Sequence, residues 1–239
     1  MTQPRLYLLD IEGTVAPLTL TSDLLFPYAR RHFSSFLRAH AGDDPVRTDL
    51  ALLAEENQAD ADADRPIFSR PDNIDSALAY LLWLMERDRK STALKSLQGR
   101  IWKHGFESGA LQGTLFPDVP AALERWAASA RVAIYSSGSV QAQQLLFRYS
   151  NAGNLTRFLS GFFDTRTGPK SEPASYSAIA QAMGVATPEV LFCSDSVREL
   201  DAARQAGCAT QLLVRPGNPP VPQDHGHARI ESFEERAAS

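Results

Sequence analysis

The sequence has 239 residues, enough for one large domain or for a domain with an insertion, and enough to bury a substantial core without disulfides. Hydrophobic residues make up 44% of the chain and charged residues 22%, which excludes intrinsic disorder and an extended coiled coil. The net charge of −4 argues against nucleic acid or an anionic membrane as the main partner.

The first predicted element is a buried strand that ends in two carboxylates. The apolar run at residues 6–9 leads directly into Asp10-Ile11-Glu12-Gly13-Thr14. In an extended segment residues i and i+2 project to the same side, so Asp10 and Glu12 can face one ligand. Like charges this close require a shared cation or proton, and Gly13 allows a sharp turn. Taken alone, the pattern also fits an ordinary strand that ends in an acidic turn.

Residues 15–113 show helical periodicity and no strand signal. We expect them to form an all-helical cap insertion, and residues 1–14 and 114–239 to form the catalytic core. On one of these helices, Trp102 and Phe106 are expected in the core of the insertion rather than in a pocket. The predicted helices cover residues 26–40, 46–58, 74–87 and 94–107, with a solvated acidic loop at residues 60–64.

Beyond residue 113, short apolar runs alternate with helical stretches. This alternation predicts an α/β fold, a Rossmann-like parallel sheet covered by helices on both faces, which binds ligands beyond the carboxyl ends of its strands. Asp10, Ser136 and Asp195 all follow such ends. The predicted strands are residues 132–135, 161–164, 190–193 and 211–214, and the predicted helices are residues 140–149, 176–183 and 197–206.

Three polar motifs follow these later strands. Ser136-Ser137-Gly138 leads into a helix N-terminus and can cradle a phosphate, although such clusters are also ordinary turns and caps. Lys170 lies in a loop before a helix, where a lysine is usually solvated. Asp195 and Glu199 supply oxygen ligands of the kind that Mg²⁺ accepts. His225 and His227 lack a third ligand and are expected in a loop rather than at a metal.

The order of these motifs along the chain is acid pair, serine cradle, lysine and acid. This order resembles the haloacid dehalogenase superfamily of phosphohydrolases over nearly the whole chain. Within it, the chain is most similar to the enolase-phosphatase (acireductone synthase) family of methionine salvage. The resemblance is carried by Asp10–Thr14, with Glu12 where most relatives have Asp, and by residues 25–28, 102–109, 134–140 and 214–218.

The resemblance implies a role for each matching residue. Asp10 corresponds to the catalytic nucleophile and a metal ligand, and Glu12 to the general acid and base whose backbone carbonyl also reaches the metal. Ser136 and Ser137 correspond to ligands of the substrate phosphate. Lys170 corresponds to a catalytic cation that also contacts the substrate.

The resemblance also implies one Mg²⁺ per chain, with Asp195 as its further ligand. Glu199 is implied to lie outside the set of metal ligands. The roles of Ser194, Arg198 and Asp201 are left open, because relatives vary around this last motif.

The implied reaction is Mg²⁺-dependent. It converts 2,3-diketo-5-methylthiopentyl 1-phosphate to the acireductone 1,2-dihydroxy-3-keto-5-methylthiopentene and phosphate. The alternatives are a phosphatase of the same superfamily with another small phosphorylated metabolite and, less favoured, a non-catalytic binding member of the fold. A dehalogenase needs neither the second acid nor the acid at Asp195.

We further expect a soluble, monomeric, cytoplasmic protein with a small-molecule substrate. The N-terminus runs into the first strand without a signal-peptide pattern, and no apolar run reaches the length of a membrane span. Cys193 and Cys208 are too few for a disulfide framework or a zinc site, so we expect both thiols to be reduced and buried.

Overall fold

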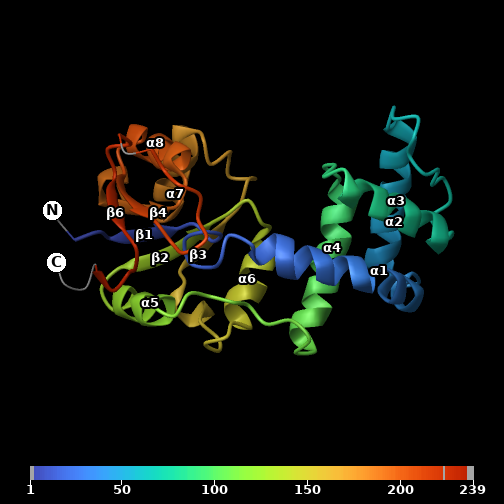
Figure 1. The fold of residues 1–239 in the computed structure, drawn as a ribbon, viewed down its shortest axis with the longest axis horizontal. Helices are drawn as coiled ribbons and strands as arrows, with labels where there is room; N and C mark the ends of the chain where they lie inside the picture. Colours follow the sequence, from blue (N-terminus) through green and yellow to red (C-terminus); the bar gives the residue numbers. More distant parts are fainter. Residues whose placement is uncertain (1–2, 223, 236–239) are drawn as a thin grey trace. The chain divides into compact units, whose positions relative to one another are not determined.

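A computed structural model describes residues 3–222 and 224–235 (Figure 1). The chain separates into two compact units. We call Met1–Leu20 together with Gln112–Ser239 the core unit, and Thr21–Leu111 the helical unit. Among the described residues, no helix is both long and apolar enough to cross a membrane.

The core unit contains a six-stranded parallel sheet in the order β3-β2-β1-β4-β5-β6. Leu9, the last residue of β1, lies level with Ile134 of β2 and Cys193 of β4. The carboxyl ends of these three neighbouring strands therefore meet at one edge. The strands are β1 Leu6–Leu9, β2 Arg131–Tyr135, β3 Gly161–Phe163, β4 Val190–Ser194, β5 Ala209–Leu213 and β6 Ala228–Ile230.

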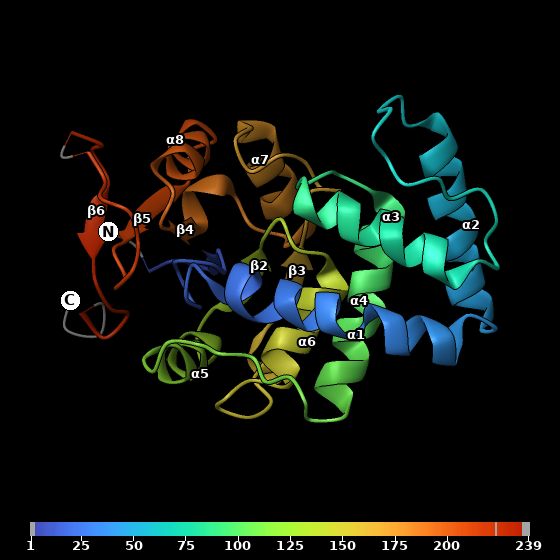
Figure 2. The same cartoon turned by 45° about the vertical axis from the view of Figure 1, so that its right-hand side comes forward.

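Helices cover both faces of this sheet, α5 and α6 on one side and α7 and α8 on the other (Figures 1 and 2). The alternation of side chains in β1 explains why both faces are needed. Leu6 and Leu8 pack in a core with Tyr176 of α7, whereas Tyr7 points to the other face and stacks on Trp126 of α5, with ring centroids 4.4 Å apart. The helices are α5 Val119–Ala127, α6 Val140–Arg148, α7 Pro173–Ala182 and α8 Val197–Gln205.

These observations confirm the predicted α/β class and the parallel sheet, with corrections to individual elements. The helix predicted from residue 176 begins at Pro173, because proline is accepted in the first turn of a helix. Among the α-helices and strands, α5 and β6 were not predicted. Cys193 and Cys208 are free and buried, as expected.

The helical unit consists of four helices preceded by a π-helical turn. Asn73 and Ser91 cap two of the helices, accepting hydrogen bonds from the backbone N–H groups of Ser76 and Leu94. The elements are the π-helix Leu20–Leu25, α1 Phe26–His40, α2 Asp44–Ala59, α3 Ile74–Glu86 and α4 Thr92–Glu107.

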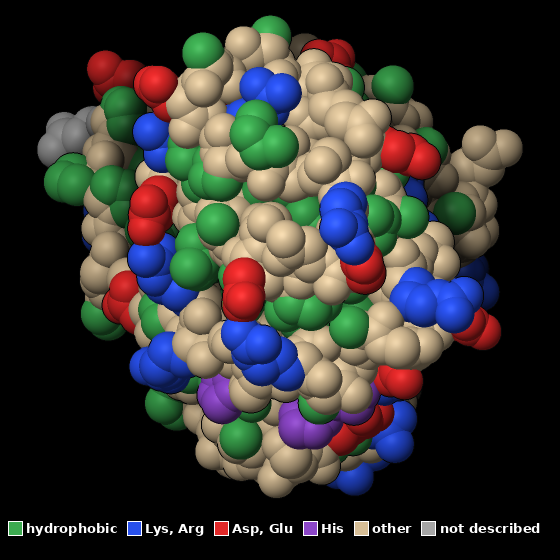
Figure 3. Space-filling view, turned by 90° about the vertical axis from the view of Figure 1, so that its right-hand side faces the viewer, with side chains coloured by type: hydrophobic (Ala, Val, Ile, Leu, Met, Phe, Trp, Pro, Cys, Tyr) green, Lys and Arg blue, Asp and Glu red, His purple; other side chains and the backbone are tan. Residues whose placement is uncertain are grey.

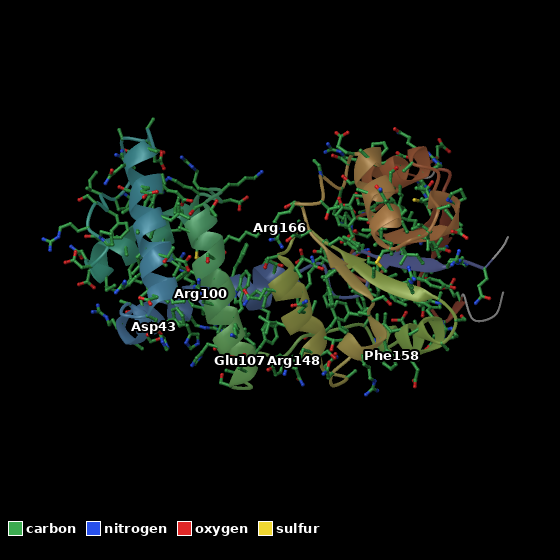
Figure 4. The ribbon with its side chains drawn as sticks, turned by 180° about the vertical axis from the view of Figure 1, so that it is seen from behind. Asp43, Arg100, Glu107, Arg148, Phe158 and Arg166 are labelled. Atoms are coloured by element: carbon green, nitrogen blue, oxygen red, sulfur yellow. The ribbon has the colours of Figure 1, made fainter. Side chains whose placement is uncertain are left out.

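Buried polar contacts tie these helices together. Arg100 of α4 donates from Nε to Asp49 of α2 over 2.6 Å, and Figure 4 labels Arg100 on its helix. Trp102 and Phe106 are both buried, and the Trp102 indole donates to the Leu25 carbonyl over 2.8 Å. The expectation that these two aromatic residues belong to the core of the insertion is confirmed.

Candidate active site

Asp10, Ser136 and Asp195 directly follow β1, β2 and β4, the three adjacent strands whose ends meet. The Asp10 backbone N–H extends the ladder by donating to the Cys193 carbonyl over 3.0 Å. Asp10 is only 7% exposed. A carboxylate this buried needs a charged or hydrogen-bonding partner.

Lys170 is that partner. Its Nζ lies 2.5 Å from Asp10 Oδ1 and 2.6 Å from Glu199 Oε2. Burial by itself would lower the pKa of the Lys170 ammonium, but the two carboxylates outweigh burial and raise this pKa. Lys170 therefore stays charged. Glu199, expected at the margin of the site, contacts the lysine directly.

Ser194, whose role the sequence left open, lies between the same two acids. Its hydroxyl oxygen is 3.0 Å from Glu199 Oε2 and 3.4 Å from Asp10 Oδ2, and it accepts a hydrogen bond from the Ser196 N–H. The residue is fully buried. Asp10, Lys170, Glu199 and Ser194 thus form one connected network.

Asp195 lies against the turn that follows β1. Gly13 has φ +72°, and a methyl group there would lie 2.6 Å from Asp195 Cγ, so only glycine fits. Burial raises the pKa of Asp195 to about 7, helped by the negative charges of Asp10 and Glu199. The structure therefore gathers more negative charge here than Lys170 alone balances.

Three hydroxyl groups hold three consecutive carbonyls of the loop that carries Lys170. Tyr135 donates to the Gly168 carbonyl over 2.8 Å, Ser175 to that of Pro169 over 2.8 Å, and Tyr176 to that of Lys170 over 2.7 Å. We call Tyr135, Ser175 and Tyr176 the hydroxyl clamp. It fixes the backbone from which the Lys170 side chain reaches Asp10.

The serine cradle is ordered by its neighbours. Ser136 Oγ accepts from the Gly138 N–H over 3.3 Å, and Ser139 caps α6. Gln143 donates from Nε2 to the Gly138 carbonyl over 2.8 Å. Asp164, which the sequence did not single out, accepts from the Val140 N–H at the start of α6 over 3.3 Å.

Asp164 also forms an ion pair with Arg166, which Figure 4 labels in the loop after β3. Burial alone would raise the pKa of Asp164, but hydrogen bonds from Arg166 and from the backbone keep it below its usual value. An ionised acid therefore lies beside the helix N-terminus next to the cradle.

The donor set around Asp10 fits Mg²⁺ rather than zinc. In the described part of the chain, no group of three or more His, Cys, Asp or Glu side chains converges as a metal cage. Mg²⁺ does not require such a cage, since it binds through one or two carboxylates together with carbonyl, water and phosphate oxygens. Asp10 and Asp195 offer the carboxylates. His227 instead contacts Thr210, with its Nδ1 2.7 Å from the Thr210 Oγ1.

Comparisons with known proteins agree with this geometry. The family model of haloacid dehalogenase-like hydrolases matches residues 4–207. The chain is 52% identical to "Enolase-phosphatase E1" of Synechococcus elongatus over 229 residues, 95% of each chain. It is 46% identical to the protein of the same name from Pseudomonas aeruginosa over 228 residues, again 95% of each.

Among solved structures, the UTR4 protein (Unknown transcript 4 protein) of Saccharomyces cerevisiae is similar with a TM-score of 0.81 and 37% identity. The match covers 97% of this chain and 99% of the yeast chain. The identities and coverages leave no substantial part of the chain unmatched. The chain belongs to the haloacid dehalogenase-like hydrolases and, within them, to the enolase-phosphatase family.

Proposed function

We propose that the protein is an enolase-phosphatase of methionine salvage. It enolises 2,3-diketo-5-methylthiopentyl 1-phosphate and then removes the phosphate, which yields the acireductone. The name shared by the similar relatives supports this assignment at 45–52% identity. The observation that carries it is the pairing of a buried Asp10 with Lys170 at the strand edge.

Asp10 is the proposed nucleophile. A carboxylate oxygen can attack phosphorus, and the Lys170 ammonium group 2.5 Å away holds the Asp10 carboxylate in place. Lys170 also offers positive charge to a phosphate that approaches Asp10. Glu12, two residues further along the turn, is proposed to protonate the leaving oxygen and then to accept a proton from the attacking water.

Ser136 and Ser137 are proposed to bind the phosphate oxygens. Both follow β2, the strand next to β1, and Ser136 is held by the Gly138 N–H. The start of α6 is already occupied by Asp164 and by the Ser139 cap, so the serine hydroxyls rather than the helix N-terminus are proposed to contact the phosphate.

One Mg²⁺ is proposed to be held by Asp10, Asp195 and the backbone carbonyl of Glu12. When bound, it supplies positive charge that polarises the phosphate and the diketone. The excess of carboxylates over the single ammonium of Lys170 supports a cation at this site.

The roles of the larger parts also belong to this proposal. We propose that residues 15–113 act as a cap and that residues 1–14 and 114–239 are the catalytic core. We further propose a monomer in the cytoplasm with a small phosphorylated substrate. The face drawn in Figure 3 carries basic and acidic side chains interspersed.

The test is a comparison of two substrates under anaerobic conditions. We expect rapid phosphate release from the diketone phosphate and slow release from p-nitrophenyl phosphate. The reverse preference would favour the alternative, a phosphatase for another small metabolite. Phosphate release at full rate in metal-free buffer would contradict the Mg²⁺ site.

A further inference from the structure

The turn that follows β1 is held by two side chains from the segment after β5. Asn218 donates from Nδ2 to the Gly13 carbonyl over 2.9 Å, and Arg215 donates from Nε to the Thr14 carbonyl over 3.0 Å. Gly13 and Thr14 directly follow Glu12. The turn that carries two of the proposed site residues is therefore anchored from more than 200 positions away in the sequence.

Arg215 can act as a rigid anchor because its own position is fixed. Its Nη1 lies 2.9 Å from Asp118 Oδ2 and donates to the Glu231 carbonyl over 3.0 Å. The rings of Phe116 and Phe233 lie 4.6 and 4.9 Å from the guanidinium carbon. The residue is 5% exposed. A planar guanidinium bound in so many directions has little freedom to move.

Asp118 is itself fixed by the C-terminal segment. Its Oδ2 accepts hydrogen bonds from the Phe233 N–H over 2.7 Å and from the Ser232 hydroxyl over 3.1 Å. Asp118, Arg215 and the C-terminal segment are far apart in the sequence, and together they form one polar network that holds the turn after β1.

Gly13 leaves this turn little room to shift. A methyl group there would meet Asp195 Cγ at 2.6 Å and Asn218 Oδ1 at 3.1 Å. Asn218 and Asp195 thus both pack closely on the same residue. A displacement of the turn would change the position of Glu12 relative to Asp195.

We propose that Arg215 and Asn218 are positioning residues for the reaction. They hold the Gly13 and Thr14 carbonyls so that Asp10, Glu12 and Asp195 keep their mutual geometry. This inference rests on the proposed function. Because a displacement of about 1 Å at a reacting group can cost about 100-fold in rate, two such ties can control turnover without touching the substrate.

The variant Asn218→Ala tests this role because it removes one tie and keeps the pair of Arg215 with Asp118. We expect kcat for the diketone phosphate to fall about 10- to 100-fold, with a much smaller change in KM. Titration with Mg²⁺ alone should show weaker binding than in the wild type. Arg215→Lys should act in the same direction, because lysine keeps the charge but lacks the fork of donors.

Gln211→Ala is the matched control. Gln211 is a buried amide of β5, the strand just before Arg215 and Asn218, and its Nε2 donates to the Ala228 carbonyl over 3.0 Å, which ties β5 to β6. It should lose a comparable amount of thermal stability while kcat and Mg²⁺ affinity stay at the wild-type values.

Two results would overturn the proposal. One is a folded Asn218→Ala protein with wild-type kcat and wild-type Mg²⁺ affinity. The other is an equal loss in Asn218→Ala and Gln211→Ala that follows the folded fraction. The Mg²⁺ titration needs no substrate. A wild type that ignores the diketone phosphate would contradict the proposed function, whereas weaker Mg²⁺ binding by Asn218→Ala would still support positioning.

Discussion

Asp10 has two proposed roles, nucleophile and metal ligand, and a comparison with Asp195, which is proposed only as a metal ligand, separates them. Its Oδ1 is bound by Lys170, whereas Asp195 packs against Gly13. A change at Asp10 therefore removes both roles. A change at Asp195 removes only a contribution to cation binding.

We expect Asp10→Asn to abolish phosphate release, because a neutral amide of the same shape cannot form the phosphoryl intermediate. Asp195→Asn should retain activity at saturating Mg²⁺ but need more of it. Phosphate release measured over a range of Mg²⁺ concentrations distinguishes the two. If excess Mg²⁺ restored Asp10→Asn as fully as Asp195→Asn, Asp10 would not be the nucleophile.

The residues that the sequence could identify are those that follow apolar runs. Asp10, Ser136 and Asp195 were predicted at strand ends, and the parallel register brings these ends together. The contacts of Ser194 with Asp10 and of Asn218 with Gly13 could not be predicted. They join positions 184 and 205 residues apart, so they depend on the fold and leave no local pattern.

At the scale of elements, the loop of Lys170 depends on the hydroxyl clamp. The loop has no regular hydrogen-bond ladder of its own, and side-chain hydroxyls take its carbonyls one after another. Removing one hydroxyl deprives a partly buried carbonyl of that partner, and a typical hydrogen bond contributes about 0.5–1.5 kcal/mol.

Tyr176→Phe should therefore lower kcat more than it changes KM, because the Lys170 backbone is released while the ring stays packed. The expected fall is about tenfold, measured with the diketone phosphate. Tyr80→Phe is the control, since Tyr80 is an equally buried tyrosine whose hydroxyl bonds Asp60 in the helical unit. Equal kcat values for the two variants would argue against a clamp specific to the lysine loop.

In the helical unit, the acidic loop is more than a solvated surface. Asp60 Oδ1 accepts from the Asp62 N–H over 3.0 Å and from Arg89 over 2.9 Å. The hydrogen bond from the Asp62 N–H lowers the pKa of Asp60 and is the largest effect. Burial acts in the opposite direction, but the charge of Arg89 adds to the lowering, so the pKa stays below its usual value. Asp60 therefore joins the loop to the segment after α3.

The lowered pKa sets the pH at which this contribution is lost. As the pH falls, the unfolded chain takes up the proton first, near the ordinary pKa of about 3.9. The contribution of Asp60 is thus complete above that value and disappears as the pH falls through the lower pKa of the folded state. Asp60→Asn should be less stable than the wild type at pH 7, and the difference should close in acid.

Urea unfolding at a series of pH values measures this difference. Asp64→Asn is the control, because Asp64 is exposed and its backbone, not its side chain, donates to Asp62. A gap between Asp60→Asn and the wild type that stayed constant from pH 7 to pH 3 would show that the carboxylate charge is not responsible.

The predictability of elements follows the strength of their own patterns. The helix predicted at residues 26–40 has those bounds in the structure, because apolar residues recur at helical spacing and Pro27 is accepted in the first turn. By contrast, β6 has only three residues and its first two are exposed. Pairing with β5, rather than its own composition, makes it a strand.

At the scale of the whole molecule, an anionic protein is proposed to bind an anionic substrate. The net charge of −4 gives no general attraction for a phosphate ester. Recognition is then proposed to come from local groups, namely Lys170, the serine cradle and the Mg²⁺ that the acids are proposed to hold. The same local groups would serve a phosphatase for another small metabolite equally well. Only the enolisation at carbon therefore distinguishes an enolase-phosphatase from such a phosphatase.

The enolase-phosphatase assignment requires one protein to complete two events in order. Under anaerobic conditions, where the acireductone survives, the diketone phosphate should give an ultraviolet-absorbing enol before or together with inorganic phosphate, with no second enzyme. Asp10→Asn provides the matched variant, because the proposed function assigns Asp10 the attack at phosphorus and gives it no proton transfer at carbon. If its cation site survives, this variant should accumulate the enol phosphate and release no phosphate. Phosphate release from the wild type that preceded any enol signal would show that hydrolysis does not depend on enolisation, and the order of the two steps would have to be reversed.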